Sequence, residues 1–200
     1  YKTIDEARYS PWYPMHFVPA YMLMQAVKKA GIKTHVINAA FPDVVNPALG
    51  KIGLAPTVGI GNIDNITPSL RLVASRMFKV PLRSVAVYMV APHFVSYYLG
   101  RYGSTGGASV YLKVMIDDKD VTSKLNKDEF FANLVPLAKR PASLQGHPVV
   151  ASSVCKIVMG ILFDTNELGH APGPNGLPGG YPVRLTRHGV EVFVPEGLTL

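Results

Sequence analysis

Hydrophobic and polar positions along the first half of the chain alternate between a helical and a strand-like spacing. Apolar residues recur every three or four positions in residues 18–30, 44–50 and 68–78, and they form short continuous runs in residues 34–39 and 57–61. We predict helices over the first set of ranges and strands over the second. Helices that alternate with short buried strands are typical of an α/β arrangement built on a parallel sheet.

The second half of the chain has the pattern of an α+β arrangement. Apolar runs predict strands over residues 84–91 and 94–99, with His93 between them, and residues 109–116 alternate as a half-exposed antiparallel strand does. The remaining pattern predicts helices over residues 127–137 and 147–163, loops over residues 1–15, 100–107 and 169–180, and a hairpin of residues 181–185 with residues 190–194.

Polar side chains gather where the two predicted strands of the first half end. Asn38 closes the first strand, and the loop that follows carries Asp43. Asn62, Asp64 and Asn65 come directly after the second strand. Because open α/β sheets bind their ligands outside the carboxyl ends of the strands, we expect a ligand site at this edge of the sheet.

His93 is the strongest candidate for acid–base chemistry. It stands in the sequence VAPHFVS, where a histidine is usually a hydrogen-bonded core residue. A histidine oriented by a carboxylate is also what proton transfer to a substrate requires, and Asp64 is the carboxylate we predict beside it. Asp64 and Asn65 are equally typical of a helix cap. Arg71 follows on the same predicted helix, either within reach of the pocket or exposed to solvent.

Composition and charge limit the number of domains and the classes of binding partner that we expect. The 200 residues, 48% of them hydrophobic, suffice for one large domain or for one domain and part of a second. The net charge of +7 is dispersed along the chain, which favours small anionic ligands or solubility, so we expect no nucleic-acid partner. Apolar runs fall short of the roughly 18 residues that a bilayer requires, so we expect no membrane partner.

The single cysteine, Cys155, lies in an apolar helical pattern, so we expect it to be buried and a poor nucleophile. One cysteine cannot form an intrachain disulfide, and we expect a cytoplasmic protein. Because the sequence begins at Tyr1 rather than at Met, we expect a fragment or a processed product.

Several common site motifs are not found in the sequence. The stretches GIGN and GRYGSTGG do not fit GxGxxG at a strand-to-helix turn, so the sequence carries no dinucleotide fingerprint. The histidines other than His93 lack metal-ligand spacing, so we expect no metal. Without GxSxG, hydrolysis through a covalent intermediate has no support.

Taken together, the order of elements and several motifs resemble the lactate/malate dehydrogenase family. The resemblance covers the last part of that family's nucleotide-binding domain and the whole of its catalytic domain. The interval from Arg71 to His93 matches the family without a gap. The resemblance implies a Rossmann-like end over residues 1–55, with its parallel sheet, and a catalytic domain over residues 56–200. The motifs that carry it are Asn38, PDVVNPAL, GIGNIDNITPSLR, VAVYMVAPH, ASSVCKIVMGILFDT and GYPVRLTRHGVEVFVP.

The resemblance also implies a cofactor, partners and residue roles. It implies NAD or NADP, bound through a motif outside this chain, a small-molecule substrate and a homo-oligomer, dimeric or tetrameric. The implied roles are proton exchange for His93, orientation of that ring for Asp64, substrate binding for Arg71, Arg8 and His147, and contact with both nicotinamide and substrate for Asn38.

Departures from the family pattern affect the substrate and the cofactor. The family has Asp followed three residues later by Arg, which clamps a carboxylate in a bidentate fork, whereas here Asp64 is followed by Thr67. Counting back from His93 puts Ile66 and Ser69 at those two positions. The departures imply a divergent member whose substrate lacks the usual carboxylate or binds it differently. The family's glycine-rich first half is not found, so these residues alone are not expected to bind NAD(H) tightly.

The sequence thus predicts an oxidoreductase that transfers hydride between a nicotinamide cofactor and a small 2-hydroxy or 2-keto acid or a related compound. Two alternatives from other classes stay open. One is a non-catalytic, dehydrogenase-like protein used for binding or assembly. The other is an NAD- and metal-dependent glycosidase of related fold, which would need a ligand set that the sequence does not display.

Overall fold

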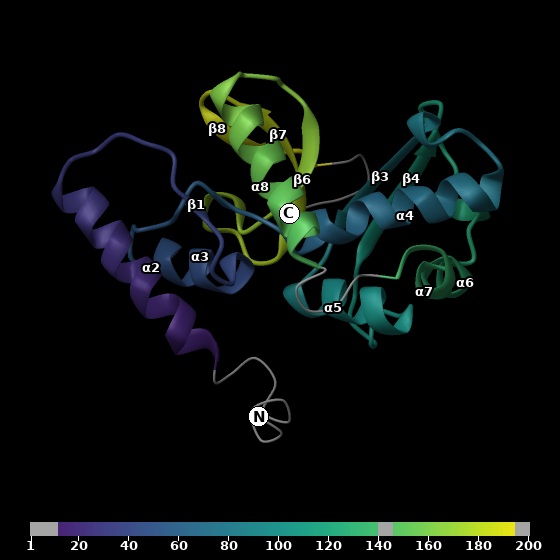
Figure 1. The fold of residues 1–200 in the computed structure, drawn as a ribbon, viewed down its shortest axis with the longest axis horizontal. Helices are drawn as coiled ribbons and strands as arrows, with labels where there is room; N and C mark the ends of the chain where they lie inside the picture. The colour runs from purple at the N-terminus through teal and green to yellow at the C-terminus, as the bar shows by residue number, and fades with distance from the viewer. Residues whose placement is uncertain (1–11, 140–145, 195–200) are drawn as a thin grey trace.

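The fold begins with two helices and a short parallel sheet. The computed structural model describes residues 12–139 and 146–194 (Figure 1). Strand β1 (Ile37–Asn38) pairs in parallel with β2 (Val58–Gly59), as the α/β pattern predicts, although each strand has only two residues. Helices α2 (Trp12–Lys29) and α3 (Pro42–Gly50) pack against each other beside this sheet around Met24, Val45 and Leu49.

The largest core lies under α4 (Ile63–Phe78), which crosses the second sheet (Figure 1). That sheet is antiparallel and consists of β3 (Val85–Val90), β4 (Tyr111–Ile116) and β5 (Lys119–Asp120). Helices α5 (His93–Tyr102), α6 (Lys127–Ala132) and α7 (Leu134–Ala138) contribute buried residues to the same core.

The third sheet is antiparallel and consists of β6 (Leu168–Pro172), β7 (Gly180–Thr186) and β8 (Gly189–Val192). Helix α8 (His147–Leu162) packs on it (Figure 1). Ala91 and Gly180 exchange backbone hydrogen bonds of 3.2 and 2.9 Å, which join the end of β3 to the start of β7. Single-turn helices η1 (Leu82–Ser84), η2 (Thr122–Lys124) and η4 (Pro174–Gly176) complete the described elements.

The prediction of a strand over residues 94–99 is wrong, because these residues lie in helix α5. Aromatic and β-branched residues favour strands only as far as packing allows. Here the buried residues Val95, Ser96 and Leu99 recur at helical spacing and face the core. Gly103, with a φ of 63°, ends the helix inside the predicted glycine-rich loop. His93 therefore begins a helix instead of connecting two strands.

Two more element predictions need correction. Residues 168–172 form β6 within a predicted loop, since their backbone pairs with β7 despite the low strand propensity of Gly169 and Pro172. Helices α2 and α4 begin five or six residues earlier than the pattern predicts. The pattern places these starts too late because proline is best tolerated in the first turn of a helix, whereas Pro19 and Pro68 lie inside their helices.

Gly59 sets how closely α3 approaches the end of β2. A Cβ atom at position 59 would overlap the ring of Pro42 and would lie 2.8 Å from the carbonyl oxygen of Pro172. Only glycine permits this approach. It brings the first turn of α3, with Asp43, to the carboxyl end of the parallel sheet.

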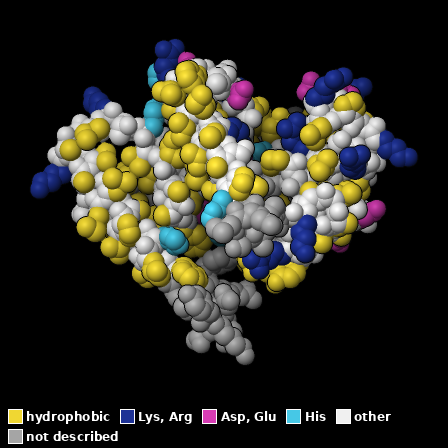
Figure 2. Space-filling view, in the orientation of Figure 1, with side chains coloured by type: hydrophobic (Ala, Val, Ile, Leu, Met, Phe, Trp, Pro, Cys, Tyr) yellow, Lys and Arg dark blue, Asp and Glu magenta, His cyan; other side chains and the backbone are white. Residues whose placement is uncertain are grey.

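The surface gives further information on the predicted partners. No helix among residues 12–139 and 146–194 is long and apolar enough to cross a membrane. Lys and Arg side chains lie at several separate places on the face in Figure 2 and do not form one basic patch there. Cys155 is exposed, so the prediction that it is buried is wrong. Its position in α8 lies outside the apolar stripe that packs on the third sheet.

Candidate active site

His93 and Asp43 form the central pair of the site. Nδ1 of His93, the first residue of α5, lies 2.7 Å from Oδ1 of Asp43 in the first turn of α3. The Asp43 side chain has no exposed surface, while the His93 side chain is 26% exposed. A carboxylate bound to one ring nitrogen fixes the orientation of an imidazole. The pair therefore directs proton exchange with a ligand to Nε2 of His93.

The second oxygen of Asp43 is held by a buried network. The side-chain amide of Asn62 donates a hydrogen bond to Oδ2 of Asp43, and the Ser96 hydroxyl donates to the amide oxygen of Asn62. Asp43, Asn62 and Ser96 are all at least 92% buried. A buried carboxylate is costly unless its oxygens accept hydrogen bonds, so this network keeps Asp43 in place for His93.

Two residues beside the pair have backbone conformations that favour glycine. Phe41, before α3, has φ 50° and ψ 51°, and Asn62, before α4, has φ 52° and ψ −112°. Such conformations cost about 1–3 kcal/mol each and persist where the surroundings fix them, often at functional sites. The Phe41 ring meets the His93 ring edge-on, with centroids 4.4 Å apart. This contact restricts the movement of the imidazole.

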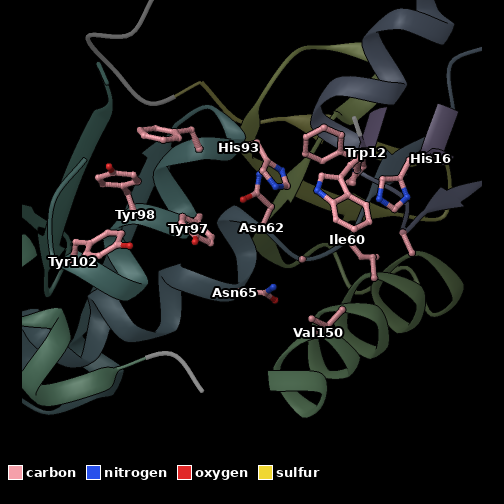
Figure 3. Close-up of a pocket in the computed structure, with 15 residues that line it drawn as sticks. Trp12, His16, Ile60, Asn62, Asn65, His93, Tyr97, Tyr98, Tyr102 and Val150 are labelled. Atoms are coloured by element: carbon pink, nitrogen blue, oxygen red, sulfur yellow. The ribbon is translucent and has the colours of Figure 1, made fainter. Parts of the chain in front are cut away.

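A cavity of about 620 Å³ opens beside His93 (Figure 3). Tyr97, Tyr98 and Tyr102 come from α5 on one side, and Trp12 and His16 come from α2 on the other. Among the described residues, no Lys, Arg, Asp or Glu lines this cavity. Its other lining residues are Ala39, Phe41, Pro42, Ile60, Gly61, Asn62, Asn65, Phe94 and Val150.

Asn65 contributes an unusual polar group to the cavity wall. The residue is 94% buried, and its side-chain oxygen has no hydrogen-bond partner among the described residues. Leaving a buried acceptor unpaired costs about 1–3 kcal/mol. Figure 3 draws the Asn65 amide on the cavity side of α4, below Asn62. The site thus offers a hydrogen-bond acceptor near His93.

The prediction that Asp64 orients His93 is corrected by the structure, which gives that position to Asp43. Asp64 is buried and forms an ion pair with Lys156 of α8, beside a second cavity. Successive residues of a helix are rotated by about 100°. Asn65 therefore faces the first cavity, while its neighbour Asp64 faces the second.

Arg71 does not lie in the cavity beside His93. Its Nε donates to the carbonyl oxygen of Val85 at 2.8 Å, and its Nη2 donates to that of Leu82 at 3.2 Å. Seven residues are close to two helical turns, so Arg71 shares the face of Asp64 and lines the second cavity. In the structure Arg71 supports the start of β3, and its contact with substrate stays a prediction.

The structure places two of the three other predicted site residues, Asn38 and His147. Asn38 ends β1, and its amide donates to Asn46 Oδ1 at 2.9 Å and to the carbonyl oxygen of Ala40 at 3.1 Å. His147 is exposed at the start of α8, one turn before the cavity residue Val150. Arg8 lies outside the described residues. The substrate-binding and cofactor-binding roles of Asn38, His147 and Arg8 stay predictions.

Some of the residues that the predictions missed carry a usable signal in the sequence. Asp43 is an acidic residue in the first turn of a helix after a strand, within the same polar cluster as Asn38. Asn62 follows the second strand directly and was part of the expected edge. Ser96 was hidden because residues 94–99 were predicted as a strand, which would not have placed its hydroxyl beside Asn62.

His170 is a second buried histidine, but its surroundings keep it neutral. It is 5% exposed, and its Nε2 accepts a hydrogen bond of 3.1 Å from the backbone N–H of Met89. Burial, together with the Lys156 cation, lowers the pKa of His170 to about 3. His170 lines the second cavity, of about 520 Å³, and connects β6 to β3. Its role is to hold these strands together.

Solved structures with a similar fold are malate and lactate dehydrogenases. No protein-family model matches the chain, and no curated protein matches it. The malate dehydrogenase of Aeropyrum pernix is 13% identical, with a TM-score of 0.59, over 92% of this chain and 64% of that one. The malate dehydrogenase of Plasmodium falciparum is 15% identical, with a TM-score of 0.57, over 94% of this chain and 64% of that one.

The same likeness extends to a lactate dehydrogenase of Eimeria maxima, whose structure holds NADH and oxamate. That enzyme is 15% identical, with a TM-score of 0.60, over 94% of this chain and 62% of that one. The chain thus spans less than two thirds of the length of these enzymes. The fold class predicted from the sequence is confirmed. This chain has the fold of the malate and lactate dehydrogenases over nearly its whole length.

Proposed function

We propose that this chain supplies the acid–base site of a nicotinamide-dependent dehydrogenase that interconverts a hydroxyl and a carbonyl group. The observation that carries the proposal is the 2.7 Å contact between His93 Nδ1 and Asp43 Oδ1 beside the cavity. Its location at the carboxyl ends of parallel strands, in a dehydrogenase fold, supports this reading over a structural role for His93.

In the oxidation direction, Nε2 of His93 accepts the proton of the substrate hydroxyl. The Asp43 carboxylate stabilises the imidazolium that results, as a buried anion bonded to Nδ1 does. Asn62 and Ser96 hold the carboxylate in place beside His93. In the reverse direction, Nε2 returns the proton to the carbonyl oxygen. A bound nicotinamide cofactor would supply the hydride acceptor for the oxidation and the hydride donor for the reduction.

The residues beside His93 fit the nicotinamide end of such a cofactor. The cavity is open next to the imidazole, and the Asn65 oxygen, which has no hydrogen-bond partner among the described residues, is an acceptor for an N–H donor such as the nicotinamide carboxamide. The sequence carries no glycine-rich turn for the pyrophosphate. We therefore assign the pyrophosphate end to residues outside this chain, and the choice of NAD or NADP to the same residues.

The test uses the intact polypeptide that contains this chain, purified as wild type and as His93→Asn. Oxidation of NADH and NADPH is followed with a panel of keto compounds. We expect His93→Asn to abolish turnover while circular dichroism shows that the fold is retained. The matched control is His188→Asn in the exposed turn between β7 and β8, which should keep wild-type turnover. Wild-type turnover in His93→Asn would overturn the proposal.

A second candidate function is a non-catalytic, dehydrogenase-like binding protein. It is favoured by Arg71, whose guanidinium is hydrogen-bonded to backbone carbonyls away from the cavity. Lack of NADH and NADPH binding by the intact polypeptide, measured by calorimetry, would favour this candidate. A small 2-hydroxy or 2-keto acid as substrate, the cytoplasmic location and the homo-oligomer stay predictions. The glycosidase alternative requires a metal, and no group of three or more metal-ligating residues lies in the described ranges.

A further inference from the structure

We propose that the cavity beside His93 selects an uncharged hydroxy or keto compound that carries an aromatic ring, in preference to a small 2-hydroxy acid. This inference rests on the proposed function, because it assigns a substrate class to the same cavity. Three properties of the wall carry it: its aromatic surface, its lack of charged side chains among the described residues, and its size.

The aromatic surface comes mainly from one face of α5. Phe94, Tyr98 and Tyr102 follow one another at intervals of four residues, with ring centroids 4.4 and 4.9 Å apart. Tyr97 lines the same cavity, and the Arg101 guanidinium stacks on its ring at 4.2 Å, which orders it from outside. Trp12 stands across the cavity from these tyrosines (Figure 3). A planar ring between such walls gains stacking contacts that a three-carbon acid cannot make.

Charge also separates the two substrate classes. A carboxylate that enters a cavity loses its hydration and needs a cation or several N–H donors in exchange. Among residues 12–139 and 146–194, no Lys or Arg lines this cavity. Arg71, which the sequence suggested for this task, is bound to the carbonyl oxygens of Val85 and Leu82. The described wall therefore favours a neutral group next to the reacting carbon.

The size of the cavity agrees with a larger substrate. Its volume of about 620 Å³ falls in the range of sites that hold drug-sized ligands. With the nicotinamide ring also placed beside His93, a small hydroxy acid would still leave the tyrosine side unfilled, whereas a phenyl ring joined to the reacting carbon would extend toward the tyrosines of α5.

The experiment compares four keto compounds that vary charge and ring independently: pyruvate, methyl pyruvate, phenylpyruvate and methyl phenylpyruvate. Each is reduced by the intact polypeptide with NADH or NADPH, and kcat/KM is measured. We expect methyl phenylpyruvate to exceed pyruvate by about tenfold or more, with the ring and the neutral ester each contributing. Equal or higher kcat/KM for pyruvate would overturn the inference.

A pair of variants tests the aromatic wall directly. Tyr98→Leu should lower kcat/KM for the two phenyl compounds by a larger factor than for the two small compounds, so that the preference for the phenyl compounds falls. Phe163→Leu removes another aromatic ring, 62% exposed and outside the cavity, and should change none of the four values. A Tyr98→Leu variant that keeps full selectivity for phenyl compounds would contradict the proposed wall.

Saturation-transfer NMR with methyl phenylpyruvate separates this inference from the proposed function. If none of the four compounds is turned over, the dehydrogenase proposal fails. Saturation of the phenyl protons by wild-type protein, reduced in Tyr98→Leu, would still support an aromatic ligand site. Absence of saturation transfer to methyl phenylpyruvate in the wild type would overturn the inference whether or not turnover is seen.

Discussion

Asp64 and Arg71 lie on the same face of α4, and that face is turned away from the cavity that contains His93. Both line the second cavity, where Asp64 pairs with Lys156 and Arg71 bonds to the carbonyl oxygens that precede and begin β3. The acid and the arginine of this helix thus support the fold, while the carboxylate beside His93 comes from α3. This division of roles leads to separate expectations for the two carboxylates.

Asp64→Asn should lower stability without removing activity. The substitution leaves the partly exposed Lys156 cation without its buried partner, and we expect a loss of about 1–3 kcal/mol in the free energy of unfolding. Urea unfolding followed by circular dichroism measures this loss, and turnover is measured well below the unfolding midpoint. A large drop in kcat with little change in stability would return Asp64 to the catalytic site.

Asp43→Asn, in contrast to Asp64→Asn, should lower activity. The neutral amide cannot stabilise an imidazolium and no longer fixes the ring tautomer, so we expect kcat to fall by about 10²–10⁴-fold. The ¹⁵N chemical shifts of the His93 ring report the tautomer directly and should change in this variant. Asp117→Asn is the control, because Asp117 is exposed and its φ of 46° suits asparagine. Unchanged ¹⁵N shifts and kcat in Asp43→Asn would exclude the pair as the acid–base centre.

The edge of the parallel sheet and His93 could be predicted because their signals are local. Apolar runs mark where β1 and β2 end, and of the polar residues that follow β2, Asn62 and Asn65 line the cavity beside His93, whereas Asp64 faces the second cavity. The partner of His93 could not be predicted in the same way. Asp43 is 50 residues away in the chain, and it reaches His93 because α3 packs closely on Gly59. The close approach of α3 to Gly59 depends on tertiary packing, which local sequence patterns do not reveal.

Residues 94–99 show a second limit of sequence patterns. Phe, Val and Tyr favour strands by propensity, and a short apolar run does not distinguish a strand from a buried helix. Helix α5 forms because Val95 and Leu99 fill the core under α4 while Phe94 and Tyr98 face the cavity. The helical form then brings Ser96 to Asn62. One misassigned element therefore concealed both the aromatic wall and one member of the hydrogen-bond network.

Asn62→Gly and Asn62→Ala together should separate backbone strain from the hydrogen bond to Asp43. Both variants remove the amide that holds Oδ2 of Asp43, so both should lower kcat. Glycine adopts the backbone conformation of residue 62, φ 52° and ψ −112°, without steric cost, whereas alanine does not. We expect Asn62→Ala to be less stable than Asn62→Gly by about 1–2 kcal/mol in urea unfolding. Equal stability of the two variants would show that position 62 is unstrained in solution.

His170→Gln should weaken the dependence of stability on pH in mild acid. Burial and the Lys156 cation lower the pKa of His170 from 6.5 to about 3, so between these values the unfolded chain binds a proton that the folded chain does not. The stability that the neutral His170 contributes is therefore fully present above the pKa of the unfolded chain. This contribution is lost as the pH falls toward the pKa of the folded chain, by about 1.4 kcal/mol per pH unit.

Glutamine offers Met89 N–H a neutral acceptor that does not titrate, so the free energy of unfolding should fall less steeply with pH in the variant than in the wild type. Urea unfolding across this pH window measures both slopes. His188→Gln is the control, because His188 is exposed and its substitution should leave the wild-type slope. Identical slopes for wild type and His170→Gln would mean that His170 is protonated in the folded chain, and that Met89 and His170 separate in acid before the chain unfolds.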